Sequence, residues 1–468
     1  MATLLALLFL ALPFDAFGHV VAGSLVTPAD VIALVVAMLT LERLATGRYR
    51  ISVSLDRPIL IFAGFLFIGA ASVILSADFS QIVIKGVVQL IGIAIMLLVC
   101  VAMTNEIARR PVLYAGYIRL SMMLLAGVAI VGVAQFVSAN ALGHPDALDF
   151  SFLNRWAGGN VWYNRGSLDG ITRANSILQE PSALGMVLGT VAGVALLRLG
   201  IGGATYRDAI RKIISLRSAI FIMAGFVVTV SVVDFVLLLV VAASIWFVSR
   251  AMSAGAMFGV LGAIIVIGVA AYSAMVSALP DVSAKVAAMS SLASEDLRVE
   301  RAEDLSAIAL AVNVSVMRAN LAREPIMGAG LGAHPITYDR ENPGLGRLPS
   351  DILTIGMNKE DAASLLIRLL SESGVVGATA FMIGLLAAVT GARRAIVQSI
   401  GAASAPSAFA ALAIGTTASM IGVGVACMAR APQYYAPWYW LPMALTVSVP
   451  ALLARVALEI RRTQNRAA

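Results

Sequence analysis

An arginine and a glutamate lie four residues apart in an otherwise apolar stretch of the chain. The stretch reads SLLIRLLSESGVVG, from Ser364 to Gly377, and the two charged residues are Arg368 and Glu372. Residues at this spacing share one face of a helix, so the two charges can pair or can line a wet cavity. Neither charge is tolerated against hydrocarbon. Two interpretations follow: a structural ion pair, or a helix end that borders a polar pocket at the outer surface of a membrane.

A second candidate lies in and just after a polar segment from about 138 to 179. This segment is rich in aromatic, Asn, Gly and Arg residues, and Arg173 precedes Glu180 where the next apolar run begins. Aromatic faces and amides suit sugars, and guanidinium groups suit phosphates. There are two structural alternatives. The tryptophans fit an interfacial aromatic belt, and Glu180, just before Pro181, fits a helix cap favoured by the helix dipole.

A glycine-rich run precedes the first candidate pair. It reads PIMGAGLGAHP, and its glycines are Gly328, Gly330 and Gly332, with His334 directly after Ala333. Such glycines permit a tight backbone whose N–H groups could face an anion. The run lacks the Lys-Ser/Thr ending of a P-loop and the strand–helix context of a dinucleotide site, so neither of those sites is predicted.

The composition identifies the solvent around these residues. Hydrophobic residues make up 60% of the 468-residue chain and charged residues 13%, and the mean hydropathy is +0.92. A soluble domain carries about 25% charged residues, so this chain is predicted to be an integral membrane protein. The net charge of +7 fits the arginine bias of cytoplasmic loops, and no nucleic-acid motif accompanies it. The two cysteines and three histidines lack disulfide-framework or zinc spacing, and no metal is expected.

Hydropathy predicts an all-α polytopic fold with about 12 transmembrane helices and a large outer loop between the ninth and tenth. The predicted spans are 2–17, 28–45, 58–75, 82–103, 113–137, 180–198, 218–231, 233–249, 254–276, 371–391, 406–426 and 437–457. Residues 1–276 then form a bundle of nine spans with an outer loop at about 138–179. Residues 277–370 form the large outer loop with surface helices, and residues 371–468 form the last three spans and a tail. The N-terminus lacks a basic region and is predicted to be a first span rather than a cleaved signal.

Basic residues orient this bundle. They cluster between spans two and three, after spans four, six and ten, and at the end of the chain: Arg43, Arg48, Arg50, Arg57, Arg109, Arg110, Arg207, Arg211, Lys212, Arg217, Arg393, Arg394, Arg461, Arg462 and Arg466. All of them lie on one side if both termini are cytoplasmic and if 218–249 crosses twice. The break is expected near Asp234, which is either a site carboxylate or a turn residue at the interface.

Two of these motifs together resemble a paired motif of the O-antigen ligase/polymerase superfamily. REPIMGAGLG is similar to a Pro-x-x-Gly-x-Gly pattern, and SLLIRLLSESGVVG is similar to a helix with Leu-x-Glu-x-Gly-x-x-Gly. The matching positions are Pro325, Gly328, Gly330, Leu370, Glu372, Gly374 and Gly377. TPADVIALVVAMLTL and RANSILQEPSALG also resemble pieces of the family, the second being closest to exopolysaccharide polymerases. The resemblance covers the layout of most of the chain but only short motifs in sequence.

The resemblance implies an enzyme of the bacterial inner membrane with both termini cytoplasmic and both polar segments periplasmic. Such enzymes join glycans carried on undecaprenyl diphosphate: a sugar hydroxyl attacks the anomeric carbon of another chain, and undecaprenyl diphosphate leaves. No cofactor is implied, because the substrate is already activated. The implied partners are these lipid-linked glycans and the bilayer, with a chain-length regulator and a flippase as further candidates.

This chemistry needs cations for the departing diphosphate and a base for the attacking hydroxyl. The candidate diphosphate ligands are Arg173, Arg301, Arg323 and Arg368. The candidate bases are Glu180, Glu372 and His334. If Glu372 pairs tightly with Arg368, it is a positioning group instead.

The chain departs from the ligase pattern at two places. Ligases carry a histidine just before the second motif, where this chain has Ala363 and Ser364, and an arginine after a serine in the central spans, where it has Val232. Both departures favour a polymerase over a ligase that transfers glycan to lipid A core or to a protein. A lipid-linked glycan flippase or transporter is the third alternative. It should show charged or broken helices within the membrane and often repeats, and no internal repeat is found here.

Overall fold

The described part of the chain is helical apart from two short β-hairpins. The computed structural model describes residues 1–17, 19–21, 24–52, 56–152, 167–168, 171–178, 180–250, 305–341, 358–360, 362–402, 407–429 and 434–467. Seven helices in these ranges are long and apolar enough to cross a membrane. They are α3 (Arg57–Leu75), α4 (Phe79–Arg109), α5 (Val112–Asn140), α7 (Pro181–Arg198), α16 (Leu365–Gly401), α17 (Ala408–Ala429) and α18 (Pro437–Ala467). The chain is therefore an all-α, multi-pass membrane protein, as its composition predicts.

Shorter elements complete the described chain. They are α1 (Ala2–Ala11), the 3₁₀ helix η1 (Leu12–Phe17), β1 (His19–Val21), β2 (Ser24–Val26), α2 (Pro28–Ala45), β3 (Ser167–Leu168), β4 (Ile171–Thr172), α8 (Ala204–Ile210), α9 (Leu216–Thr229), α10 (Val232–Ser249), α13 (Leu305–Arg323) and α14 (His334–Glu341). The start of α2 shows how the sequence sets a boundary. Thr27 and Asp30 form a reciprocal capping box, and Pro28 occupies the first helical turn.

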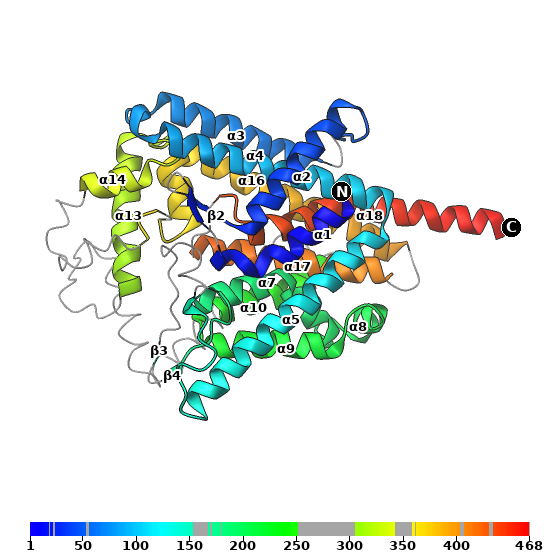
Figure 1. Ribbon diagram of the computed structural model, residues 1–468. Helices are drawn as coiled ribbons and strands as arrows, with labels where there is room; N and C mark the ends of the chain where they lie inside the picture. The colour runs from blue at the N-terminus through cyan, green and yellow to red at the C-terminus, as the bar shows by residue number, and fades with distance from the viewer. Residues whose placement is uncertain are drawn as a thin grey trace.

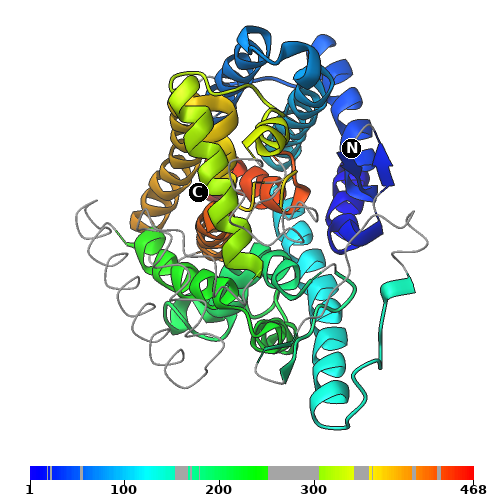
Figure 2. The same ribbon diagram turned by 90° about the vertical axis from the view of Figure 1, so that its left-hand side faces the viewer.

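The bundle has two groups of helices joined by α17 and α18. One group contains α3, α4 and α16, and the other contains α5, α7, α9 and α10 (Figure 1). Both hairpins, α13 and α14 gather at one end, which we call the motif end (Figure 1). Figure 2 looks onto that end and shows α13 lying across the bundle. The opposite end carries α8, the loop between α2 and α3, and the end of α18.

Most predicted spans coincide with observed helices, with two corrections. The predicted span 2–17 is interrupted, because α1 ends at Ala11 and a 3₁₀ helix follows. Helix α16 begins at Leu365, six residues before the predicted span 371–391, and α13 and α14 lie within the predicted loop 277–370. The predicted span 254–276 lies outside the described residues.

The predicted break within 218–249 is confirmed. Helix α9 ends at Thr229, Val230 adopts the left-handed conformation at φ 46°, and α10 follows. The end of α9 lies beside Arg173, whereas the end of α10 lies beside Arg393 of α16. The two helices therefore run in opposite directions. With α9 and α10 antiparallel, α8, the α2–α3 loop and the end of α18 all lie at the end of the bundle opposite the motif end (Figure 1). The predicted arginine pattern requires these three segments to share one end.

Candidate functional site

The two motif segments bind each other through their backbones. Ala329 N–H donates to the Ser371 carbonyl and Gly330 N–H to the Glu372 carbonyl, both at 3.0 Å. In the other direction, the Val375 N–H donates to the Pro325 carbonyl at 3.1 Å, and the Val376 N–H donates to the Ile326 carbonyl at 3.2 Å. The glycine-rich run thus packs against α16 as a turn-forming segment. The Ala329 and Gly330 N–H groups that the sequence could have offered to an anion are used in these protein hydrogen bonds.

A break in α16 makes this pairing possible. Gly374 has φ 61° and ψ −167°, which interrupts the helix and frees the carbonyls of the preceding turn. That region of backbone space is essentially restricted to glycine. Gly328, at φ 69°, faces the break: a Cβ on Gly328 would lie 2.6 Å from the Ser373 nitrogen, and one on Gly374 would lie 2.5 Å from the Gly328 nitrogen. Both matched glycines are therefore required by close backbone approach.

Arg368 and Glu372 form an ion pair in the turn of α16 just before the break. Arg368 Nε lies 3.3 Å from Glu372 Oε2, and the side chains are 6% and 0% exposed. The Arg368 guanidinium also lies 4.7 Å from the centre of the Tyr434 ring, a cation–π contact. The second carboxylate oxygen, Glu372 Oε1, has no hydrogen-bond partner among the described residues. The predicted pairing of the two charges is present, and it is buried.

An aromatic cluster holds Tyr434 under this pair. Trp440 Nε1 donates to the Tyr434 carbonyl at 2.6 Å, and the Phe65 ring lies 6.3 Å from the Tyr434 ring. Burial of the phenol and then the Glu372 charge raise the pKa of Tyr434 well above its usual value. The ring therefore stays neutral and presents its π face to Arg368.

His334 belongs to a buried chain of hydrogen bonds that ends on α16. The Thr337 hydroxyl donates to Asn320 Oδ1 at 2.7 Å, and Asn320 Nδ2 donates to Ser371 Oγ at 2.6 Å. Ser371 Oγ lies 2.9 Å from His334 Nδ1, and His334 Nε2 lies 2.7 Å from Asn313 Oδ1. Because the Asn313 amide nitrogen donates to the Ala309 carbonyl, the histidine proton is assigned to Nε2. The chain joins α13, α14 and α16.

These contacts use both ring nitrogens of His334, the third candidate base, within the protein. Both ring nitrogens are engaged, and the side chain is fully buried. Burial and then the Arg368 charge lower the pKa of His334 to about 3. The imidazole is thus neutral at physiological pH, and Ser371 hydrogen-bonds to it one residue before Glu372.

This burial predicts a pH dependence of stability. An unfolded histidine binds a proton near pH 6.5 and the folded one only near pH 3, so the folded state loses stability as pH falls between these values. The slope from this residue is about 1.4 kcal/mol per pH unit. We expect His334→Gln to reduce the loss of thermal stability between pH 6.5 and pH 4.5 relative to the unmodified protein. An unchanged pH slope in the variant would contradict the assignment.

A second cluster surrounds Arg173. Arg173 is half-buried and its Nε donates to the Thr229 carbonyl at 2.9 Å, at the end of α9. Burial lowers the pKa of Arg173, and the nearby Asp234 carboxylate opposes that change. Asp234 is buried in the first turn of α10 and packs over Gly185 of α7. The Thr229 and Ser231 side chains lie near its carboxylate, and the Thr229 hydroxyl donates to the Phe226 carbonyl. Asp234 is therefore a buried carboxylate beside an arginine, in the first helical turn after the break.

Three further candidate residues are Glu180, Arg323 and Arg301. Glu180 is the N-cap residue of α7 and is half-buried, but its side chain does not cap the helix. Arg323 is exposed at the end of α13, two residues before the first motif segment. Arg301 lies outside the described residues. In the described ranges, no three His, Cys, Asp or Glu side chains gather as a metal site would require.

Sequence reasoning missed the residues that join the site from other helices. Ser371 was inside the quoted motif, but Asn313, Asn320 and Tyr434 had no distinguishing pattern. The available signal was the presence of two asparagines, Asn313 and Asn320, among the apolar residues of the segment that forms α13. The chain matches no protein-family model. No curated protein matches it either.

Proposed function

We propose that this protein is an inner-membrane polysaccharide polymerase that joins undecaprenyl-diphosphate-linked glycan units at the periplasmic face. The hydroxyl oxygen of one unit attacks the anomeric carbon of another chain. The bond from that carbon to the diphosphate breaks, and its electrons leave with undecaprenyl diphosphate. The hydroxyl proton passes to a carboxylate base. In this proposal the motif end faces the periplasm and both termini are cytoplasmic.

The observation that carries the proposal is the backbone pairing of the two motif segments. Residues 325–330 and 371–376, which resemble the family motif in sequence, meet through four backbone hydrogen bonds at the broken turn of α16. A pairing of this kind gives the spacing of both motifs a physical reason. The Arg368–Glu372 pair lies beside this backbone pairing, at the same end of the bundle as Arg173 and Arg323.

The contacts favour different roles for the five charged candidate residues that the structure describes. Arg173 is half-buried and uses its Nε to bind the Thr229 carbonyl, and its two terminal guanidinium nitrogens suit a diphosphate oxygen. Arg323, exposed beside the motif, suits the approach of an anionic headgroup. Arg368 and Glu372 position the motif turn, because each is buried against the other. Glu180 then fits the role of base better than Glu372 does.

A flippase or transporter of lipid-linked glycan is the second candidate. The observation in its favour is the combination of a broken helix, α16, with buried charges, which transporters use at their binding sites. A ligase is the third alternative, and the residues at 232 and 363–364 still count against it.

Analysis of lipid-linked glycans after deletion of the gene separates these functions. A polymerase deletion leaves single repeat units on the usual acceptor. A ligase deletion leaves long chains on the undecaprenyl carrier, and a flippase deletion traps single units on the cytoplasmic side. Single units on the usual acceptor are the expected result, and either other pattern would overturn the proposal.

Arg173→Ala is expected to reduce chain growth by roughly a hundredfold or more while the protein level stays normal, because one cationic ligand of the leaving group is lost. Glycan length on gels from a complemented deletion strain measures this. Arg318→Ala, which removes an exposed arginine of α13, is the matched control and should support normal chains. Normal chain lengths in Arg173→Ala would remove this residue from the site.

A further inference from the structure

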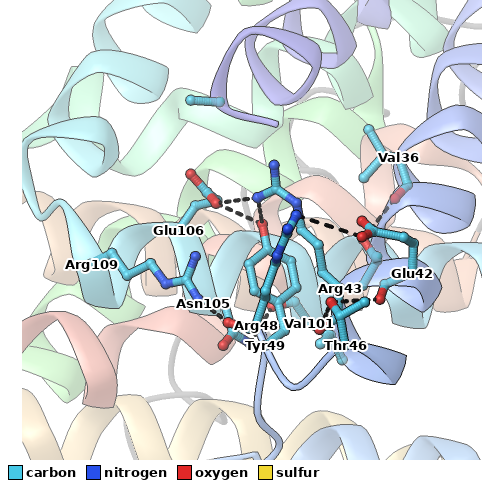
Figure 3. Close-up of polar contacts among 12 residues, drawn as sticks. Val36, Glu42, Arg43, Thr46, Arg48, Tyr49, Val101, Asn105, Glu106 and Arg109 are labelled. Atoms are coloured by element: carbon cyan, nitrogen blue, oxygen red, sulfur yellow. Dashed lines mark hydrogen bonds and ion pairs between the residues drawn. The ribbon is translucent and has the colours of Figure 1, made fainter.

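A polar cluster lies where the loop after α2 meets the end of α4 (Figure 3), at the end of the bundle opposite the motifs (Figure 1). Arg43 donates to the Tyr49 hydroxyl at 2.7 Å and to Glu106 Oε1 at 2.9 Å, and the Tyr49 hydroxyl donates to the same oxygen at 2.6 Å. Tyr49 is buried, and burial followed by the Glu106 hydrogen bond raises its pKa. We call Arg43, Tyr49 and Glu106 the Tyr49 cluster.

The Tyr49 cluster fixes the backbone of a short arginine-rich loop. Arg43 and Arg109 lie over the Tyr49 ring, with their guanidinium carbons 5.1 Å and 5.0 Å from its centre. Arg109 also donates to the Arg48 carbonyl. Asn105 exchanges two hydrogen bonds of 3.1 Å with the backbone of Arg50. The loop is thus held to α4 through its main chain, which leaves its arginine side chains available for other contacts.

Positive charge exceeds negative charge at the surface formed by this loop and the end of α4. Glu106 pairs with Arg43, and Glu42 lies 3.6 Å from Arg48 with both side chains well exposed. Arg50 and Arg109 are exposed and make no ion pair with any described residue. Exposed pairs such as Glu42–Arg48 contribute little, so three guanidinium groups remain able to bind an anion.

Apolar side chains border these charges. Leu41 on α2 is 53% exposed and Ile51, next to Arg50, is 43% exposed. Both α3, directly after the loop, and α4 are long and apolar enough to cross a membrane, so the loop lies where such a helix leaves the hydrocarbon. The surface therefore presents guanidinium groups beside exposed apolar side chains. An amphiphile with a negative headgroup matches both features, whereas a free phosphate matches only the charge.

We propose that Arg48, Arg50 and Arg109 form a binding site for the phosphate of an anionic phospholipid headgroup. Guanidinium groups bind phosphate oxygens through paired N–H donors, and each basic residue at a membrane surface strengthens binding of anionic lipid about fivefold. The Tyr49 cluster lies beneath the loop and keeps the three arginines in position. The site is independent of the proposed glycan chemistry at the motif end.

Lipid binding to the purified full-length protein in a neutral detergent tests this proposal. Phosphatidylglycerol and phosphatidylcholine are titrated separately, and the bound lipid is counted by native mass spectrometry. We expect preferential retention of phosphatidylglycerol. Arg50→Gln combined with Arg109→Gln should weaken it by about thirtyfold, and Arg50→Gln alone, which leaves the Tyr49 stacking intact, by about fivefold.

The matched control is Arg461→Gln combined with Arg462→Gln. It removes the same charge from exposed arginines of α18 at the same end of the bundle and should bind phosphatidylglycerol as the unmodified protein does. Equal retention of both lipids by the unmodified protein would overturn the proposal. So would an equal loss in the control, or displacement of the lipid by millimolar inorganic phosphate, which would assign the site to free anions.

Discussion

Arg368→Met is expected to destabilise the protein by about 3–5 kcal/mol, because it leaves Glu372 buried without its cation. The arginine stem is replaced by a side chain of similar length, so the loss of charge dominates over the loss of packing. The contact with the Tyr434 ring is lost as well. Chemical unfolding in detergent micelles measures the change in free energy of unfolding.

The double variant Arg368→Met, Glu372→Leu separates stability from chemistry. Removing both charges should recover most of the lost stability, since apolar replacements of buried ion pairs are often neutral. Chain growth should stay lost if the pair also positions the motif turn for catalysis. Normal chain growth in the double variant would limit the pair to a structural role, and a double variant as unstable as the single one would contradict the pairing itself.

Gly374→Ala is expected to cost several kcal/mol and to abolish function, with Gly328→Ala close behind. A Cβ on Gly374 would lie 2.6 Å from the Ile326 carbonyl carbon and 2.5 Å from the Gly328 nitrogen, all of them backbone atoms. The positive φ adds about 1–3 kcal/mol of strain. To avoid these clashes, either the backbone of α16 at the break or the segment 325–330 must shift. We therefore expect the four backbone hydrogen bonds between the two segments to be lost. Hydrogen exchange at Ala329 and Gly330 measures this directly.

Gly391→Ala is the matched control for this change. Gly391 lies in the same helix with open space around it, so alanine should be neutral or should stabilise α16 by about 0.5–1 kcal/mol. If Gly374→Ala and Gly391→Ala have equal stability and equal amide protection at Ala329, the described packing of the two motifs is wrong.

Much of the fold could be predicted from the sequence because membrane helices are specified locally. Long apolar runs and basic flanks identified α3, α4, α5 and α7 to within a few residues. The break between α9 and α10 followed from length and charge parity. Helical spacing placed Arg368 and Glu372 on one face and allowed the ion pair, which was one of the two interpretations.

The environment of the site could not be predicted, because it depends on contacts between distant segments. The break at Gly374 is hidden inside a helical pattern and becomes necessary only when the glycine run packs against it. His334 looked like a base, but Asn313 and Ser371 occupy both of its nitrogens. The sequence left Asp234 as either a site carboxylate or a turn residue, and its burial against Gly185 of α7 is visible only in the packed structure.

Reconstituted protein incubated with a defined polyprenyl-diphosphate-linked repeat unit gives the most direct test of the polymerase proposal. Mass spectrometry of the lipid-linked products follows both glycan length and released polyprenyl diphosphate. The account predicts glycans of two or more units together with one released polyprenyl diphosphate per linkage formed. Single units that only change leaflet, with no diphosphate released, would contradict it.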